Sequence, residues 1–336
     1  MAQIVLGLGT SHSPQLSTPP DLWRNHGERD KRNPDLRKPD GRVYTYEEVL
    51  ASASPSLQKE LTPDTWQVRY DACQKGIAQV GATLADVAPD VLVMIGDDQK
   101  ELFQDNNMPA MLVYWGDTFH NVPRYGRGQN VPPSLQAAAW AYGEKEQDFP
   151  IATDLASHII GSLMEQEFDV AHSCQLPPHE GMGHAFSFIY RRIMNGTPMP
   201  TVPIMLNTYY PPNQPTPKRC YALGQALRQA IESWPSAKRV AVIASGGLSH
   251  FVIDEELDQQ IITAMQNKDA ATLTSIPKER LNSGNSEIRN WIATAGAVEH
   301  LQMQLIDYVP CYRSPAGTGC AMGFAQVGIA GNLRRK

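Results

Sequence analysis

The sequence predicts an α/β protein, a single large domain with a central mixed or mostly parallel sheet flanked by helices. Short apolar runs rich in β-branched residues alternate with longer segments of helical periodicity. The 336 residues are 42% hydrophobic and 19% charged, which is enough apolar material for a large core. No internal repeat and no interdomain linker is visible, so we expect one domain over residues 1–336.

The expected strands are short apolar runs with little polar interruption. Strands of a parallel sheet have this character because helices cover both of its faces. A weaker strand-like run covers residues 111–115. The strongest runs place strands at residues 4–8, 91–95, 202–206 and 240–244.

The expected helices show apolar periodicity together with start signals. Pro63 and Asp64 introduce a helix over residues 65–87. Asp154 is expected to be the N-cap of a helix over residues 155–167. Further helices are predicted at residues 218–234, 255–267 and 287–301. Polar or proline-rich loops are predicted at residues 25–44, 121–134 and 207–217, and a polar insertion extends around residues 25–60.

Composition and charge exclude several classes of function. The formal net charge of -6 gives no reason to expect a nucleic-acid partner. The N-terminus lacks the features of a signal peptide, and no apolar run approaches the length of a membrane span. The five cysteines are scattered and form no C-x-x-C pair, which disfavours a disulfide framework and a cysteine-based zinc site. We therefore expect a cytoplasmic enzyme.

Two histidines follow predicted strands closely, and two glutamates open predicted helices. His12 comes after the first strand, and His250 comes after the strand at 240–244 through a glycine-rich turn. Glu256 and Glu287 are the carboxylate candidates, although acidic residues at helix starts also compensate the helix dipole. Two neutral ligands and one carboxylate on one face of a metal suit non-haem iron(II) oxygen chemistry, and a further histidine can move protons.

The motifs around these residues resemble one family. The run GLGTSHSP, which contains His12, resembles the N-terminal metal-ligand motif of class III extradiol dioxygenases, such as the catalytic subunit of protocatechuate 4,5-dioxygenase. The run ASGGLSH, which ends at His250, resembles the motif that carries that family's acid/base histidine. Glu287 stands four residues before Trp291, as does the family's carboxylate ligand, and Glu256 lies too close to His250. The nearest branch is that of gallate and 3-O-methylgallate dioxygenases.

The resemblance implies a role for each candidate. His12 and Glu287 would bind Fe(II), and His250 would be the catalytic acid/base. His184 or His179 would contact the substrate, and the resemblance extends to Thr318 as a contact of a substrate carboxylate. The implied reaction is extradiol ring cleavage of a catechol- or gallate-type aromatic acid by dioxygen, as in the catabolism of lignin-derived aromatics.

One position departs from the family pattern. The second histidine ligand usually comes from an Asn-Asp-His motif after the second strand, and here Gln99 ends the run GDDQ at that place. An amide oxygen is a poorer donor for iron(II) than an imidazole. Gln99 could ligate directly or through water, His120 or Asp98 could complete the shell, or the site could bind metal weakly or take a different metal.

The sequence leaves open which part of the protein shields the site from water and which class of function the protein has. The insertion at 25–60, a small partner subunit or the other half of a homodimer could exclude water from the site. The alternative to a dioxygenase is a metal-binding, non-catalytic protein of the same fold, or a hydrolase that uses zinc.

Overall fold

The computed structural model describes residues 1–123, 131–177 and 180–328. In these ranges nine strands form one sheet in the order β11-β13-β1-β10-β4-β9-β5-β8, with β12 paired to β13. The strands are β1 Gln3–Thr10, β4 Val91–Asp97, β5 Met111–Tyr114, β8 Ala171–Ser173, β9 Thr201–Leu206, β10 Arg239–Ser245, β11 His250–Val252, β12 Gln302–Tyr312 and β13 Thr318–Gly328.

The sheet is mixed, as the sequence predicted. Strands β1, β10, β4 and β9 run parallel to one another at its centre. Antiparallel pairs flank them, with β13 against β1, β11 and β12 on one side and β5 against β9 on the other. All of the predicted strands lie in this sheet, so the predicted fold class is confirmed.

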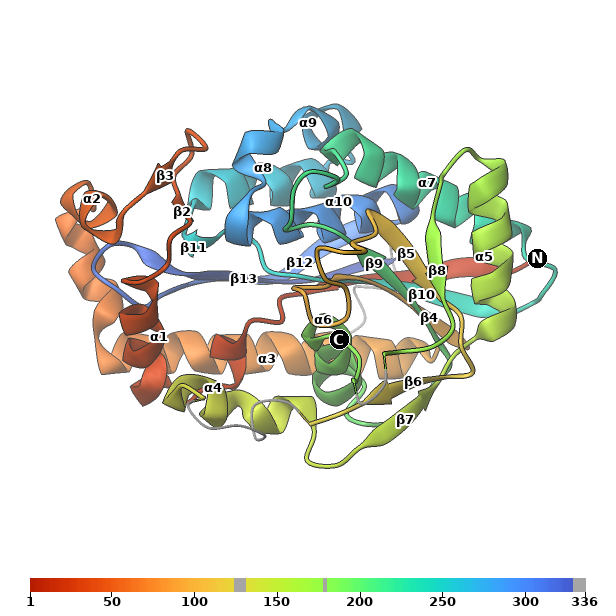
Figure 1. Cartoon of the computed structure of the whole chain (residues 1–336), viewed down its shortest axis with the longest axis horizontal. Coiled ribbons are helices and arrows are strands. Elements are labelled where there is room, and N and C mark those ends of the chain that lie inside the picture. The colour runs from red at the N-terminus through yellow and green to blue at the C-terminus, as the bar shows by residue number, and fades with distance from the viewer. Residues whose placement is uncertain (124–130, 178–179, 329–336) are drawn as a thin grey trace.

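Helices cover both faces of the sheet (Figure 1). Helices α7, α8, α9 and α10 lie on one face, and α3 and α6 lie on the other. The helices are α1 Trp23–Asp30, α2 Tyr46–Ala51, α3 Pro63–Val87, α4 Pro133–Ala138, α5 Thr153–Glu165, α6 His184–Phe188, α7 Pro217–Ser233, α8 Glu255–Gln266, α9 Ala270–Ser275 and α10 Ile288–Ala297.

Two predicted helix boundaries were wrong. Helix α5 begins at Thr153 with Ala152 at its N-cap, so Asp154 lies in the first turn, where its charge favours the helix dipole. Helix α10 begins after a 3-10 turn at Ser283–Glu287 and ends at Ala297, because the chain must then turn into β12.

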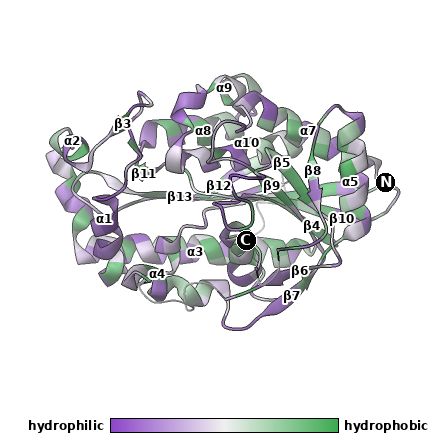
Figure 2. Ribbon diagram, viewed as in Figure 1, coloured by the Kyte–Doolittle hydropathy of each residue, from purple (hydrophilic) through white to green (hydrophobic). Residues whose placement is uncertain are grey.

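The central strands supply both cores of the protein. In β4, Val91, Val93 and Ile95 pack into the core beneath α7, α8 and α10, whereas Leu92 and Met94 pack into the core beneath α3 and α6. This alternation follows from the two-residue repeat of a strand with both faces covered. Figure 2 shows the hydrophobic residues concentrated along the strands and the inward sides of the helices.

The predicted polar insertion folds as a layer over one end of the sheet. It contains α1, α2 and a two-stranded sheet of β2 Leu36–Arg37 and β3 Val43–Tyr44. Leu36, Tyr46, Val49 and Ala316 form a small core of their own beneath it. A separate small sheet pairs β6 Thr118–Asn121 with β7 Gln147–Pro150.

The helices of the described ranges are too short or too polar to cross a lipid bilayer.

Candidate active site

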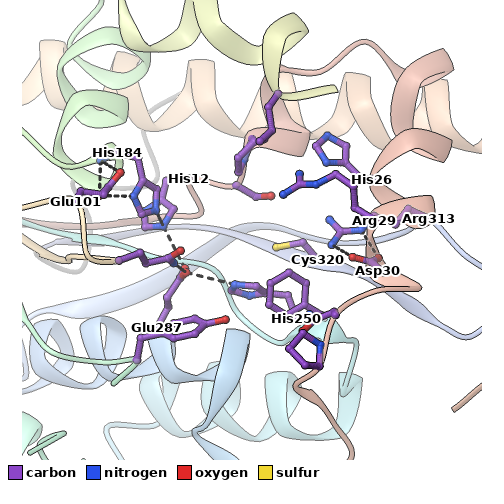
Figure 3. Close-up of a pocket in the computed structure, with 18 residues that line it drawn as sticks. His12, His26, Arg29, Asp30, Glu101, His184, His250, Glu287, Arg313 and Cys320 are labelled. Atoms are coloured by element: carbon purple, nitrogen blue, oxygen red, sulfur yellow. Dashed lines mark hydrogen bonds and ion pairs between the residues drawn. The ribbon is translucent and has the colours of Figure 1, made fainter. Parts of the chain in front are cut away.

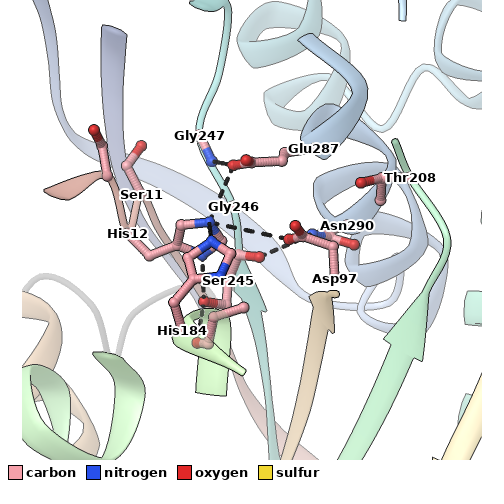
Figure 4. Close-up of polar contacts among 12 residues, drawn as sticks. Ser11, His12, Asp97, His184, Thr208, Ser245, Gly246, Gly247, Glu287 and Asn290 are labelled. Carbon is pink, nitrogen blue, oxygen red and sulfur yellow. Dashed lines mark hydrogen bonds and ion pairs between the residues drawn. The ribbon is translucent and has the colours of Figure 1, made fainter. Parts of the chain in front are cut away.

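Four buried side chains with metal-ligating atoms meet at the carboxyl edge of the central strands (Figure 4). His12 follows β1, and Asp97 is the last residue of the nearby strand β4. His184 opens α6, and Glu287 lies immediately before α10. The carboxyl ends of parallel strands are where open α/β sheets place their ligands, so the topology itself brings these residues together.

The distances within this cluster match those between ligands of a single ion. His12 Nε2 lies 3.2 Å from Glu287 Oε2 and 3.2 Å from His184 Nε2. Asp97 Oδ1 lies 4.0 Å from His12 Nε2, and one ligand atom from each of the four residues lies within 4.8 Å of the others. Two ligands at right angles, each about 2.1 Å from an ion, are about 3 Å apart.

Hydrogen bonds hold both histidines in the tautomer that a metal requires. Ser245 donates its hydroxyl proton to the Ala185 carbonyl at 2.6 Å, so it accepts from His12 Nδ1 at 3.0 Å. His184 Nδ1 donates to the Glu101 carboxylate at 2.8 Å. In both residues Nε2 is therefore the ring nitrogen that faces the cluster, as in the carboxylate–histidine–metal arrangement of known sites.

The electrostatics of the cluster also fit a bound cation. Among the described residues, Asp97 Oδ2 is buried and has no hydrogen-bond partner. Burial and the neighbouring charge of Glu287 raise the pKa of Asp97 to about 6. Burial alone would lower the pKa of His184, but the Glu101 carboxylate outweighs it and raises that pKa to about 9. Two carboxylates and two imidazoles in one dry space would all be satisfied by a divalent ion.

Glu287 is held in place by contacts that explain its spacing from Trp291. The Gly247 N–H donates to Glu287 Oε2 at 2.5 Å, and Gln99 Nε2 donates to Oε1 at 3.0 Å. The Trp291 indole donates to the Gly246 carbonyl at 2.8 Å and lies so close to Gly9 that a Cβ there would be 2.4 Å from the ring. Trp291 thus fixes the first turn of α10 against β1 and the turn that follows β10.

His250 lies beside the cluster with one nitrogen turned toward it. Its Nδ1 donates to the Leu248 carbonyl at 2.8 Å, and its Nε2 lies 3.3 Å from Glu287 Oε1. Burial lowers the pKa of His250, but Cys320 and Glu287 outweigh that effect and hold the pKa well above its usual value. Because Nδ1 is committed to the Leu248 carbonyl, Nε2 is the ring nitrogen that is left to exchange a proton at this site.

The turn that carries His250 is anchored to α8. The N–H and the hydroxyl of Ser249 donate to Asp258 at 2.8 and 2.6 Å, and the Tyr308 hydroxyl donates to the same carboxylate at 2.8 Å. Burial raises the pKa of Asp258 to about 7, against the lowering effect of these hydrogen bonds.

Asp258→Asn is expected to change how stability depends on pH. The pKa of Asp258 rises from 3.8 to about 7 on folding, so between these values the native state binds more protons than the unfolded state. This group therefore makes the free energy of unfolding fall as pH rises, by at most about 1.4 kcal/mol per pH unit. Urea unfolding at about pH 5, 6 and 7 should show this fall in the wild type and a shallower one in Asp258→Asn. The prediction would be contradicted if the free energy of unfolding fell equally with pH in the wild type and in Asp258→Asn.

A cavity of about 610 Å³ lies against the cluster (Figure 3). The polar insertion, one of the three covers considered, supplies part of its wall. The lining residues are His12, Ser13, Pro14, His26, Arg29, Asp30, Asn33, Pro34, Gln99, Glu101, Leu135, His184, Tyr209, His250, Phe251, Glu287, Arg313 and Cys320.

Other predicted candidates lie elsewhere. His120 lies on β6, bonded to Asp148 at 2.8 Å, and does not line the cavity. Asp98 accepts hydrogen bonds from the next loop, at the Leu102 N–H, so its neighbour Asp97 is the carboxylate in the cluster. Glu256 is exposed on α8. His179, which was predicted as a possible substrate contact, lies outside the described residues.

Thr318 is buried behind the cavity wall. Its hydroxyl donates to Asp30 Oδ2 at 2.6 Å, and it is not among the lining residues. Any effect of Thr318 on a ligand in the cavity would therefore act through Asp30.

Several residues of the site were not predicted from the sequence. Asp97 carried a usable signal, since it ends a buried strand next to the cluster. Glu101 lies two residues after Gln99, and a carboxylate so near a candidate ligand motif is a reasonable partner for a histidine. His26 and Arg29 carried no signal, because nothing in their local pattern shows that the insertion folds back over the sheet.

The fold and the cluster together define a class of protein. It is an α/β protein in which a cluster of two histidines and two carboxylates could hold a metal ion and opens into a cavity beside a third histidine, His250. The family model for the catalytic LigB subunit of aromatic ring-opening dioxygenase matches residues 49–319, and the chain belongs to that family. The resemblance noted in the sequence is thus confirmed, although His12 lies before the matched residues.

Two curated relatives are similar over part of their length. A gallate dioxygenase of Pseudomonas putida is 34% identical over 155 residues, which are 43% of this chain and 45% of that protein. A 2,3-dihydroxyphenylpropionate/2,3-dihydroxicinnamic acid 1,2-dioxygenase of Comamonas testosteroni is 28% identical over 179 residues, 53% of this chain and 49% of that protein. The chain thus spans about half the length of these relatives.

Proposed function

We propose that this protein is an iron(II)-dependent extradiol dioxygenase that opens the ring of a catechol- or gallate-type aromatic acid. One observation carries the proposal: two histidine Nε2 atoms and the Glu287 carboxylate converge at one end of a cavity that can hold an aromatic ring. Two histidines and one carboxylate with open positions are the ligand set of non-haem iron(II) oxygenases. Membership of the ring-opening family supports the same reaction.

In this proposal His12, His184 and Glu287 hold the ion, and Asp97 is a second carboxylate beside it. His184 takes the place of the histidine that Gln99 replaces, because its tautomer is fixed by Glu101 and its Nε2 lies 3.2 Å from that of His12. The Gln99 amide nitrogen is already directed at Glu287, so Gln99 orients that carboxylate instead of ligating.

Iron(II) in this position would bind the adjacent hydroxyls of the substrate together with dioxygen and allow electrons to pass between them. His250 Nε2 takes the proton of a ring hydroxyl and returns it as the ring opens, while the Leu248 carbonyl holds the imidazole in the required orientation. Tyr209 and Phe251 line the cavity beside His250 and flank the ring. The insertion excludes water from the reacting atoms.

The substrate favoured is gallate or 3-O-methylgallate. The similarity to a gallate dioxygenase supports this choice. The similarity to a dihydroxyphenylpropionate dioxygenase makes aromatic acids with a longer side chain further candidate substrates.

The test is oxygen uptake by protein loaded anaerobically with iron(II), on a panel of catechols, gallates and dihydroxyphenylpropionate. We expect rapid uptake with at least one aromatic acid, together with the absorbance of an opened ring. Metal analysis of the same sample identifies the bound ion.

Two results would overturn the proposal. Bound iron with no oxygen uptake across the panel would favour a metal-binding protein without this chemistry. Zinc retained from the purification, with hydrolytic activity, would favour a metallohydrolase.

A further inference from the structure

A second large cavity, which we call the α3 cavity, lies between α3 and the segment that follows α6. Its volume is about 700 Å³, and its walls are mainly apolar. It has no lining residue in common with the cavity beside the metal-ligating cluster, so a ligand bound there would occupy a separate site. The lining residues are Gln74, Ile77, Ala78, Gly81, Ala82, Leu84, Ala85, Ala88, Pro89, Arg192, Ile193, Met194, Asn195, Thr197 and Met199.

Small side chains of α3 form one wall of the α3 cavity. Ala78, Ala82 and Ala85 lie on one face of the helix and are exposed. At Gly81 the two walls come close together, because a Cβ there would lie 2.8 Å from the Ile193 carbonyl oxygen. A wall of alanine methyl groups beside this contact leaves room for a flat or slender apolar group.

Arg192 brings a positive charge to the α3 cavity. Its Nη1 donates to Ser17 Oγ at 2.5 Å, and its Nη2 donates to Gln74 Oε1 at 2.6 Å. Its guanidinium also lies 4.5 Å from the centre of the Trp140 ring. Burial lowers the pKa of Arg192, but a guanidinium remains charged at neutral pH. Arg192 belongs to the π-helical turn Ile189–Ile193, a kind of irregularity that is frequent at functional sites.

The charge of Arg192 is not balanced by a carboxylate of the described residues. Its two hydrogen-bond partners, Ser17 and Gln74, are neutral, and no ion pair joins it to residues 1–123, 131–177 or 180–328. The two bonds use only part of the N–H groups of the guanidinium, so donors remain for a ligand. A partly buried cation among apolar groups is stabilised when an anion binds beside it.

We infer that the α3 cavity binds a small carboxylic acid with an apolar body, with the carboxylate on Arg192 and the body against the alanines of α3. A guanidinium is suited to this role because it can donate two parallel hydrogen bonds to a carboxylate. The apolar walls favour such an acid over a strongly hydrated anion, which would lose its water without gaining other polar partners. The site goes beyond the proposed ring-opening reaction and does not depend on it.

The test compares 3-phenylpropionate with its neutral analogue 3-phenylpropanamide by calorimetric titration of the protein. The wild type should bind the acid at least about tenfold more tightly than the amide, and Arg192→Gln should remove that preference by weakening binding of the acid. Arg192→Lys should keep part of the preference. Arg191→Gln is the matched control, since Arg191 is the neighbouring arginine and does not line the α3 cavity.

A second variant tests the cavity without removing the charge. Ala82→Phe places a ring in the α3 cavity from an exposed position of α3, so it should fold normally and weaken binding of both acid and amide. Equal affinities for acid and amide in the wild type, or no binding of the acid, would overturn the inference. Binding of the acid that is unchanged in Arg192→Gln or in Ala82→Phe would also overturn it, because the acid would then be bound elsewhere.

Discussion

Replacement of His184 by alanine is expected to weaken metal binding at least about 100-fold. Its Nε2 lies 3.2 Å from His12 Nε2, and its Nδ1 is hydrogen-bonded to Glu101. His12 is the other histidine of the four-residue cluster and already occupies its own position, so it cannot replace His184. Loss of a partner behind a ligand already costs about 10–100-fold, and loss of the ligand itself should cost more. Iron retained after gel filtration against a competing chelator measures the effect.

Two matched variants make this result specific. Glu101→Gln removes the charge behind His184 and should weaken metal binding by about 10–100-fold. Gln99→Ala removes only the donor to Glu287 and should cost about tenfold or less. The ligand assignment is wrong if Gln99→Ala loses the metal while His184→Ala retains it, because the amide would then be the second neutral ligand.

The sequence was sufficient for the centre of the fold and for one strand-end residue of the cluster, His12, whereas Asp97 at the end of β4 was not predicted. Strands β1, β4, β9 and β10 are continuous apolar runs, because both of their faces are covered, and such runs are visible without any knowledge of their partners. The topology of a parallel sheet then places His12 and Asp97 at one edge. Glu287 was preferred to Glu256 only because its spacing to Trp291 resembles the family's pattern, and in the structure Trp291 packs on Gly9.

The hairpin β12–β13 and the insertion were not predictable in the same way. Strand β12 alternates between exposed and buried residues and crosses a register shift between Leu305 and Asp307, which weakens its apolar pattern. The insertion supplies only three buried residues to its small core, and Ala316 comes from the turn between β12 and β13, so the position of the insertion depends on contacts with the rest of the protein. His26 and Arg29 reach the cavity only because of that position.

The position of His184 in the cluster could not be predicted from the sequence pattern around it. The local sequence around His184, with Gly183 before it and helix α6 after it, does not indicate that His184 lies near the strand ends. Its contact with His12 joins residues that are 172 positions apart. The absence of a histidine at Gln99 was visible in the sequence. His184, which we propose as the replacement ligand, is brought to the cluster only by the three-dimensional fold, where Glu101, two residues after Gln99, accepts a hydrogen bond from its Nδ1.

Replacement of His250 by alanine is expected to leave the metal in place and reduce turnover by about 10²–10⁴-fold. His250 Nε2 lies 3.3 Å from Glu287 Oε1, outside the set of four ligating residues, so the variant should retain iron like the wild type. Its Nδ1 is fixed on the Leu248 carbonyl, which leaves Nε2 as the single site of proton transfer. The rate of ring opening under substrate saturation, with metal content measured on the same sample, tests both parts.

Added imidazole distinguishes lost proton transfer from a structural defect. The space left by the His250 side chain lies in the cavity wall, so free imidazole can enter it and should restore part of the turnover of His250→Ala. His172→Ala, at an exposed histidine on β8, is the control and should behave as the wild type with or without imidazole. Loss of iron in His250→Ala would make His250 a ligand, and unchanged turnover with iron bound would remove it from the reaction, because no proton transfer would then depend on its Nε2.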